Sequence, residues 1–235
     1  MIKEIIKIKS NGVTKRFFLG FNGLQINLDD IREKHKLSKN SQVIDYLLNL
    51  LTDMNNKHPQ AVLQILNPEF LLSKDHLIRA FYHAQKAFDT KMNISNQKSI
   101  ELLLYLSATR QISEAFNRFG IKISNEKSNS NIEFVYFIAN NEDTIDLIKN
   151  QLVNNIPAKE NFSIISEISI KKIAEIIGTY GITINQIGVV FQSYDIPFKY
   201  ENALENNNLK DLHNAIQDII LEKMALLSLE KITND

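Results

Sequence analysis

The chain contains no cysteine and only seven glycines among its 235 residues. The absence of cysteine excludes disulfide bonds, zinc–thiolate sites and cysteine nucleophiles, and it fits the reducing cytosol. We therefore expect a cytoplasmic protein. So few glycines leave little material for a glycine-rich phosphate loop, and neither the GxxxxGK nor the GxGxxG pattern occurs. The HExxH, GxSxG and kinase catalytic-loop patterns are also missing.

Neither sign of charge is in excess, because 27 Lys and Arg residues balance 27 Asp and Glu residues. This balance argues against a strongly basic protein that coats nucleic acid, although it is compatible with a local basic patch. No stretch approaches the ~20 apolar residues of a membrane span. The five histidines do not have the spacing of a metal site. We expect no cofactor, no metal and no membrane partner, and we favour a binding or scaffold protein over an enzyme.

The apolar fraction of 44% is ample for a core, and the length favours one domain over residues 1–235. Hydrophobic patterning predicts an α/β fold in which a mixed β-sheet packs against several helices. Extended segments are predicted at 2–9, 13–19, 20–26, 61–66, 132–139, 162–168 and 187–194, with a hairpin turn at Asn11-Gly12. Helices are predicted at 28–36, 42–54, 74–88, 100–106, 110–119, 142–152, 169–179 and 209–231.

The helix that follows Ser73 carries basic side chains at i, i+3, i+7 and i+10, opposite its apolar face. They are His76, Arg79, His83 and Lys86. A solvated helix face is the commoner outcome for such a stripe. The alternative interpretation is a line of phosphate contacts that follows a nucleic-acid backbone without making the whole protein basic.

The segment 96–120 is predicted to form a buried helix, a polar corner and a second helix. Asn96 is placed to cap the first helix, and the corner reads Ser-Ala-Thr-Arg-Gln with Arg110 at its fourth position. Spacing alone favours an ordinary helix–loop–helix corner. A rigid polar corner beside an apolar helix is also suited to presenting side chains to a partner.

Several segments of the chain, taken together, resemble a known family. They are LSATRQISEA at 106–115, QILN at 64–67, SKDHLIRA at 73–80, LEKMALLSL at 221–229, and the single positions Asn96 and Glu101. In this order they are similar to the small regulatory subunit of the KEOPS complex, the family of the protein that binds the p53-related protein kinase. The resemblance points to an archaeal member. Segments 28–58 and 179–208 look like insertions relative to the family.

The resemblance implies a single α/β domain without catalytic activity of its own. Such a subunit docks on a small kinase/ATPase and holds the single-stranded 3′ CCA end of tRNA. It thereby supports formation of threonylcarbamoyladenosine next to the anticodon, and it meets the other KEOPS subunits only indirectly. The remaining alternatives are a protein-interaction scaffold without RNA binding, and a small-molecule-binding or enzymatic domain built from the two insertions.

Two groups of candidate site residues follow. The RNA contacts are expected at His76, Arg79, His83, Lys86, Asn96 and Arg110. The final helix has an apolar stripe, most of which we expect to pack in the core, with its last turns as the better interface candidates. The candidate kinase contacts on that stripe are Ile216, Ile219, Ile220, Met224 and Leu227.

Overall fold

A computed structural model describes residues 1–123 and 131–229, and the described residues form two compact units. The sheet unit comprises Met1–Pro68 and Gly120–Ile165, and the helical unit comprises Glu69–Phe119 and the residues from Ser166 onward. Each unit is therefore assembled from two separate stretches of the chain. Whether residues 1–235 form one domain, with insertions at 28–58 and 179–208, stays a prediction.

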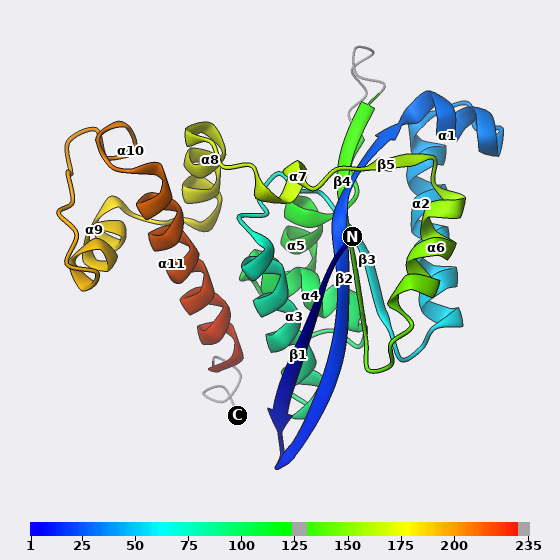
Figure 1. The fold of residues 1–235 in the computed structure, drawn as a ribbon, viewed down its shortest axis with the longest axis horizontal. Coiled ribbons are helices and arrows are strands. Elements are labelled where there is room, and N and C mark those ends of the chain that lie inside the picture. The colour runs from blue at the N-terminus through cyan, green and yellow to red at the C-terminus, as the bar shows by residue number, and fades with distance from the viewer. Residues whose placement is uncertain (124–130, 230–235) are drawn as a thin grey trace. The chain divides into compact units, whose positions relative to one another are not determined.

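The sheet unit contains, among the described residues, a five-stranded sheet with the order β1-β2-β4-β3 (Figure 1). The first part of β2 pairs with β1 and its last part pairs with β5, and every pairing is antiparallel. The strands are β1 (Ile2–Ser10), β2 (Val13–Asn27), β3 (Val62–Leu66), β4 (Asn131–Asn140) and β5 (Ala158–Glu160). The predicted α/β class is confirmed, but the sheet is antiparallel rather than mixed in direction.

Three helices cover one face of this sheet, namely α1 (Leu28–His35), α2 (Asn40–Lys57) and α6 (Ile145–Asn155) (Figure 1). Alternate residues of the strands meet the apolar stripes of the helices, as the two periodicities require. Each buried aliphatic side chain contributes roughly 1.5–3 kcal/mol. The core includes Leu24, Ile26, Leu63, Ile65, Phe134, Tyr136 and Ile138 from the strands, and Val43, Leu47, Leu51, Ile145, Ile148 and Leu152 from the helices.

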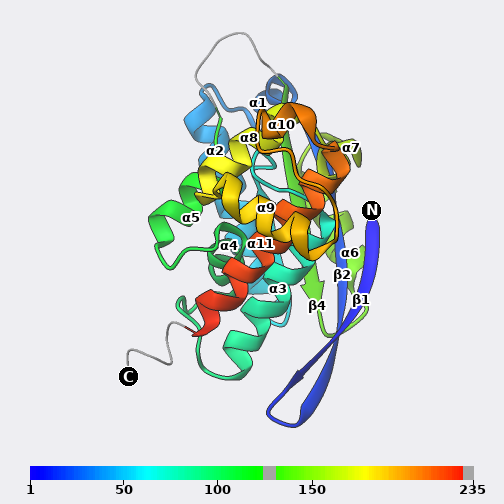
Figure 2. The ribbon, with the colours of Figure 1, turned by 90° about the vertical axis from the view of Figure 1, so that its left-hand side faces the viewer.

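The helical unit is built around its last helix, α11 (Leu209–Leu229), which contacts α3, α4, α8 and α9 (Figure 2). The predicted end of this helix at residue 231 lies outside the described residues. The other helices are α3 (Lys74–Asp89), α4 (Lys98–Ser107), α5 (Ile112–Phe119), α8 (Ile170–Tyr180), α9 (Ile184–Ser193) and α10 (Ala203–Asn206). Among the described residues, no single helix passes a length and hydropathy test for a membrane span, and only the bent pair α8 and α9 passes it together.

Two predicted strands are wrong, because most of their residues lie in helices. The segment 187–194 belongs to α9, where the Thr183 hydroxyl accepts the N–H of Gln186 at 3.2 Å and caps the helix. The segment 162–168 contains α7 (Ser163–Ser166), whose first N–H is accepted by the Asn161 side chain at 3.1 Å. The helix predicted at 142–152 also begins later, after Thr144.

Candidate functional site

The corner between α4 and α5 is closed by a left-handed residue. Ala108 has φ 47° and ψ 43° at the C-terminus of α4. The N–H of Ala108 donates to the carbonyl of Tyr105 at 3.1 Å, and the N–H of Thr109 donates to that of Leu104 at 3.1 Å. This pair of bonds is the Schellman arrangement, which usually has glycine at the left-handed position. The predicted corner is therefore present, and it is tightly turned.

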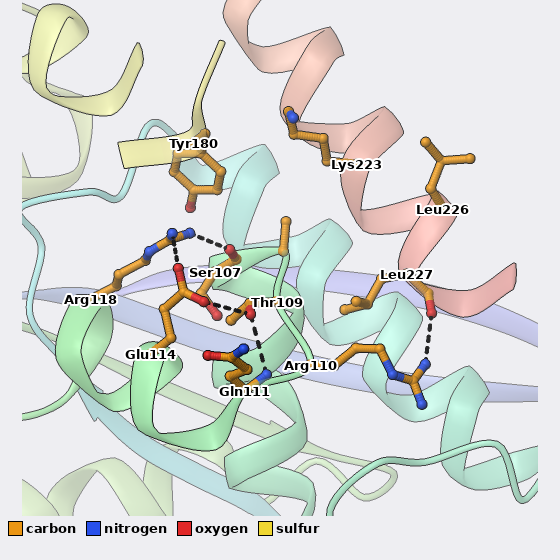
Figure 3. Close-up of a pocket in the computed structure, with 11 residues that line it drawn as sticks. Ser107, Thr109, Arg110, Gln111, Glu114, Arg118, Tyr180, Lys223, Leu226 and Leu227 are labelled. Carbon is orange, nitrogen blue, oxygen red and sulfur yellow. Dashed lines mark hydrogen bonds and ion pairs between the residues drawn. The ribbon is translucent and has the colours of Figure 1, made fainter. Parts of the chain in front are cut away.

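Three side chains and two backbone groups lock this corner (Figure 3). The Thr109 hydroxyl accepts the N–H of Gln111 at 3.2 Å and donates to the Glu114 carboxylate at 2.8 Å. The other oxygen of Glu114 pairs with the Arg118 guanidinium. Arg118 also donates to the carbonyl of Ser107, the last residue of α4, at 2.7 Å. An otherwise unpaired carbonyl at a helix end is thus satisfied by a charged donor.

A cavity of about 460 Å³ opens over this corner. Three basic side chains line it, those of Arg110, Arg118 and Lys223, together with the one carboxylate of Glu114. The rest of its wall is formed by Ser107, Ala108, Thr109, Gln111, Tyr180, Leu226 and Leu227. The cavity therefore combines positive charge, uncharged hydrogen-bonding groups and an apolar side (Figure 3).

The three cations of the cavity differ in their availability. Arg118 is paired with Glu114, and its guanidinium lies 5.4 Å from the centre of the Tyr180 ring. Arg110 makes a long contact of 3.5 Å to the carbonyl of Leu227. Among the described residues, neither Arg110 nor Lys223 pairs with a carboxylate. These two side chains are free to bind an anion, whereas Arg118 holds the corner in shape.

His76 does not belong to an exposed stripe, which corrects the sequence interpretation. Its side chain is fully buried. The N–H of Leu72 donates to Nδ1 at 3.3 Å, so the proton must be on Nε2, which faces the carbonyl of Leu106 at 3.0 Å. Burial lowers the pKa of His76 to about 4. A neutral, enclosed imidazole has no route to a phosphate, so His76 is a core residue.

The remaining members of the stripe lie on the outer side of α3. Arg79 and Lys86 are exposed, and His83 is half-buried. The His83 ring stacks on Tyr105, with ring centres 5.5 Å apart and an angle of 19° between the planes. Burial, and next the charges of Lys86 and Arg79, lower the pKa of His83 to about 4. The stripe therefore offers two cations and one neutral ring near pH 7.

Asn96 is separated from Arg110 by the whole of α4, because the first precedes this helix and the second follows it. Ten residues of helix span about 15 Å. Asn96 is exposed, and the residue at the N-cap is Gln97, so the predicted cap is wrong. Asn96 and Arg110 do not form one compact site.

Glu101 is one of the positions that carry the family resemblance, and the structure shows that its side chain has a structural role. Its carboxylate is fully buried and accepts the N–H of Ser95 at 2.7 Å and that of Ile94 at 3.0 Å. It therefore holds the segment that leads into α4. A glutamate in an otherwise apolar helix face is the signal that points to such a role.

The five proposed kinase contacts on α11 are all buried, which corrects their assignment to a surface. Their helix lies among α3, α4, α8 and α9, so its apolar stripe is core. The exposed fractions are 5% or less for Ile216, Ile219, Ile220, Met224 and Leu227. The large exposed apolar side chains of the last turns are instead Leu226, at 48%, and Leu229, at 54%.

Comparison with known sequences decides the family. A sequence model of the family described as kinase binding protein CGI-121 matches residues 27–228. The chain belongs to this family. The EKC/KEOPS complex subunit CGI121 of Candida albicans is 32% identical over 75 residues, which are 31% of this chain and 36% of that relative. The resemblance to the KEOPS regulatory subunit is thus confirmed, and the alignment spans about a third of the relative's length.

The α4–α5 corner and its cavity lie within the residues that match the CGI-121 family. Sequence reasoning identified Arg110 but missed Arg118 and Lys223. The spacing of Glu114 and Arg118, four residues apart on one helix, is a readable sign of an ion pair. Lys223 gave no such sign, because it reaches the corner from α11, more than a hundred residues along the chain.

Proposed function

We propose that this chain is a non-catalytic, cytoplasmic subunit of a KEOPS complex that binds the complex's kinase and the 3′ CCA end of tRNA. Membership of the CGI-121 family and the name of the Candida relative support the kinase and the complex. The observation that carries the RNA half is the cationic cavity over the α4–α5 corner. In this role the subunit supports threonylcarbamoyladenosine formation, and the chemistry belongs to other subunits.

The cavity has the groups that a single-stranded RNA end requires. Arg110 and Lys223 meet backbone phosphates, and the side-chain amide of Gln111 offers donors and an acceptor to the edges of unpaired bases. Leu226 gives an apolar surface for a base face. Because the corner is already held by its hydrogen bonds, little conformational entropy is lost when the RNA binds.

The RNA half is tested with a tRNA that carries the CCA end and the same tRNA without it. The full-length protein should bind the first more tightly. Arg110→Ala and Lys223→Ala should each weaken that binding about tenfold, since a charge-assisted contact contributes ~1.5 kcal/mol. Lys210→Ala, an exposed lysine on the same α11 helix, is the matched control and should bind normally. Equal affinity for both tRNAs would favour the alternative function, a protein-interaction scaffold that does not bind RNA.

Removal of charge at Arg79 and Lys86 tests whether the outer side of α3 takes part. If these side chains meet phosphates, the dependence of affinity on salt flattens by nearly one unit for each contact removed. If the variant that lacks both charges keeps the salt dependence of the wild type, the stripe is an ordinary solvated helix face that does not contact RNA. His76 is left out of the test because it is buried.

The kinase half is assigned to the end of α11, where Leu229 is exposed. A pull-down of the full-length protein from native cells should recover the kinase and the transferase subunit. Leu229→Lys should remove the kinase and leave RNA binding intact. Val189→Lys, which changes a side chain 63% exposed on α9, is the matched control. Retention of the kinase by Leu229→Lys would place the docking surface elsewhere.

A further inference from the structure

The β1–β2 hairpin carries a concentration of positive charge that the whole chain lacks. Residues 1–27 contain five basic residues and one acidic residue, whereas the full sequence is balanced. In both views the tip of the hairpin extends past α2 and α6 of its own unit (Figures 1 and 2). Most of the hairpin precedes residues 27–228, so the match to the family implies nothing about its surface.

Four of these cations, Lys3, Lys7, Lys9 and Arg16, share one face of the hairpin. Lys7 lies directly opposite Arg16, and Lys9 lies opposite Thr14. Side chains of directly opposed residues project from the same face of an antiparallel pair, as do those two residues apart on one strand. Lys7, Lys9 and Arg16 are all exposed. We call these three residues the basic face of the hairpin.

The pairing of Lys7 with Arg16 is unfavourable for folding, because like charges directly opposite each other in a sheet are destabilising. Among the described residues, no carboxylate pairs with any of the three cations. Lys3, in contrast, is neutralised by Asp146 at 2.5 Å and is not counted with them. The Arg16 guanidinium lies 4.7 Å from the centre of the Phe18 ring, which holds it in place. These cations repel one another in the folded hairpin, and no carboxylate of the described residues neutralises them. We take this as an indication that they bind an anion from another molecule.

We propose that the basic face of the hairpin binds the phosphate backbone of double-helical RNA. Lys7 and Lys9 are about 6.6–6.8 Å apart along the strand, close to the spacing of successive phosphates. Single-stranded RNA would require exposed aromatic rings for stacking. The aromatic ring on this face, that of Phe18, is partly buried and covered by Arg16. The face therefore suits a regular backbone, which proteins contact by shape and charge.

This inference rests on the proposed tRNA function, since tRNA stems are the double-helical RNA that the subunit would meet. It concerns a surface of the sheet unit, whereas the cavity that receives the 3′ end belongs to the helical unit. The two contacts are therefore separable by experiment.

The test uses a blunt RNA duplex of twelve base pairs, which has no single-stranded CCA end, and the full-length protein. Affinity is measured by fluorescence anisotropy between 50 and 300 mM NaCl. We expect Lys7→Gln/Lys9→Gln/Arg16→Gln to weaken binding at least tenfold at 100 mM NaCl and to lower the slope of log affinity against log salt by about two to three. The control, Lys39→Gln/Lys57→Gln/Lys159→Gln, removes the same charge from exposed positions of the same unit and should bind like the wild type.

Equal weakening by both triple variants would show a general charge effect and overturn the inference, as would duplex binding that the hairpin variant leaves unchanged. Binding of the wild type to vesicles with 30% phosphatidylserine, without binding to the duplex, would reassign the face to an anionic membrane. The wild type could bind tRNAs with and without CCA equally well while the hairpin variant still weakens duplex binding. That result would refute the cavity proposal and leave the hairpin proposal intact. Circular dichroism of each variant confirms that it is folded.

Discussion

The carbonyl oxygen of Leu106 lies 3.0 Å from Nε2 of His76, inside the helical unit. This contact fixes a neutral imidazole in a position without solvent, with Nδ1 accepting the N–H of Leu72. Protonation of the ring would place a donor where an acceptor is needed, and it would bury a charge. The pair therefore links the stability of the helical unit to pH.

We predict that the free energy of unfolding falls as the pH falls from about 6.5 to about 4. The pKa of His76 is about 4 in the folded protein and ~6.5 in the unfolded chain, so only the unfolded chain binds the proton in this window. The stabilisation is complete above pH 6.5, and ~3 kcal/mol of it is lost by pH 4. His83 acts in the same direction. His76→Gln should flatten the dependence measured by urea unfolding.

Ala108→Gly should stabilise the protein by about 0.5–1 kcal/mol. A left-handed conformation costs an alanine ~1–2 kcal/mol, part of which is offset because glycine gains more entropy in the unfolded chain. Thermal unfolding measures the change. Ala84→Gly, in the middle of α3, is the opposite control and should destabilise by at least ~1 kcal/mol. A loss of stability in Ala108→Gly would contradict the left-handed corner.

Glu101→Ala should destabilise the protein by roughly 2–5 kcal/mol. The change leaves the N–H groups of Ile94 and Ser95 without their carboxylate acceptor and removes a buried side chain. Urea unfolding gives the free energy. Glu222→Ala changes an exposed glutamate on α11 and should stay within ~0.5 kcal/mol of the wild type. Equal effects of the two substitutions would mean that the Glu101 contacts contribute little.

Lys7→Glu should raise the thermal stability while it weakens binding to duplex RNA. The substitution turns a like-charged cross-strand pair with Arg16 into an opposite-charged one, a difference of about 0.5–1 kcal/mol at low salt. The gain should shrink as salt is added. Stability and binding that fall together would instead show that Lys7 has a structural role in the hairpin.

Local sequence patterns correctly predicted the helices and strands in which the hydrophobic periodicity and the capping or turn residues indicate the same structure. The hairpin was readable from alternation and Asn11-Gly12, and α3 from Ser73 and its apolar face. The strand predicted at 187–194 failed because a run of β-branched residues resembles a strand, while the capping box of Thr183 and Gln186 decides for a helix. Residues 187, 188 and 191 are buried, as one face of a helix requires.

The site was predictable where its residues are near in sequence. The corner that contains Arg110 was recognised from a ten-residue segment, and its cavity includes that residue. His76 was misassigned because residue spacing shows only which side chains lie on the same face of a helix. Whether that face is buried depends on the other helices that pack against it. Lys223 depends on the same long-range packing, and no local pattern encodes it.

The order of strands in the sheet also constrains how the protein folds during its synthesis. β4 lies between β2 and β3, and Leu66 pairs with Val135. β3 therefore leaves the ribosome before its partner strand exists, and α3, α4 and α5 are made in between. Until β4 is synthesised, β2 and β3 each have an unpaired edge. Unpaired strand edges are prone to pair with the wrong strand or with another chain. The sheet is complete only when β3 and β4 pair, which closes a loop of more than sixty residues. A pause in translation after residue 119 would therefore prolong the intermediate in which β2 and β3 have unpaired edges.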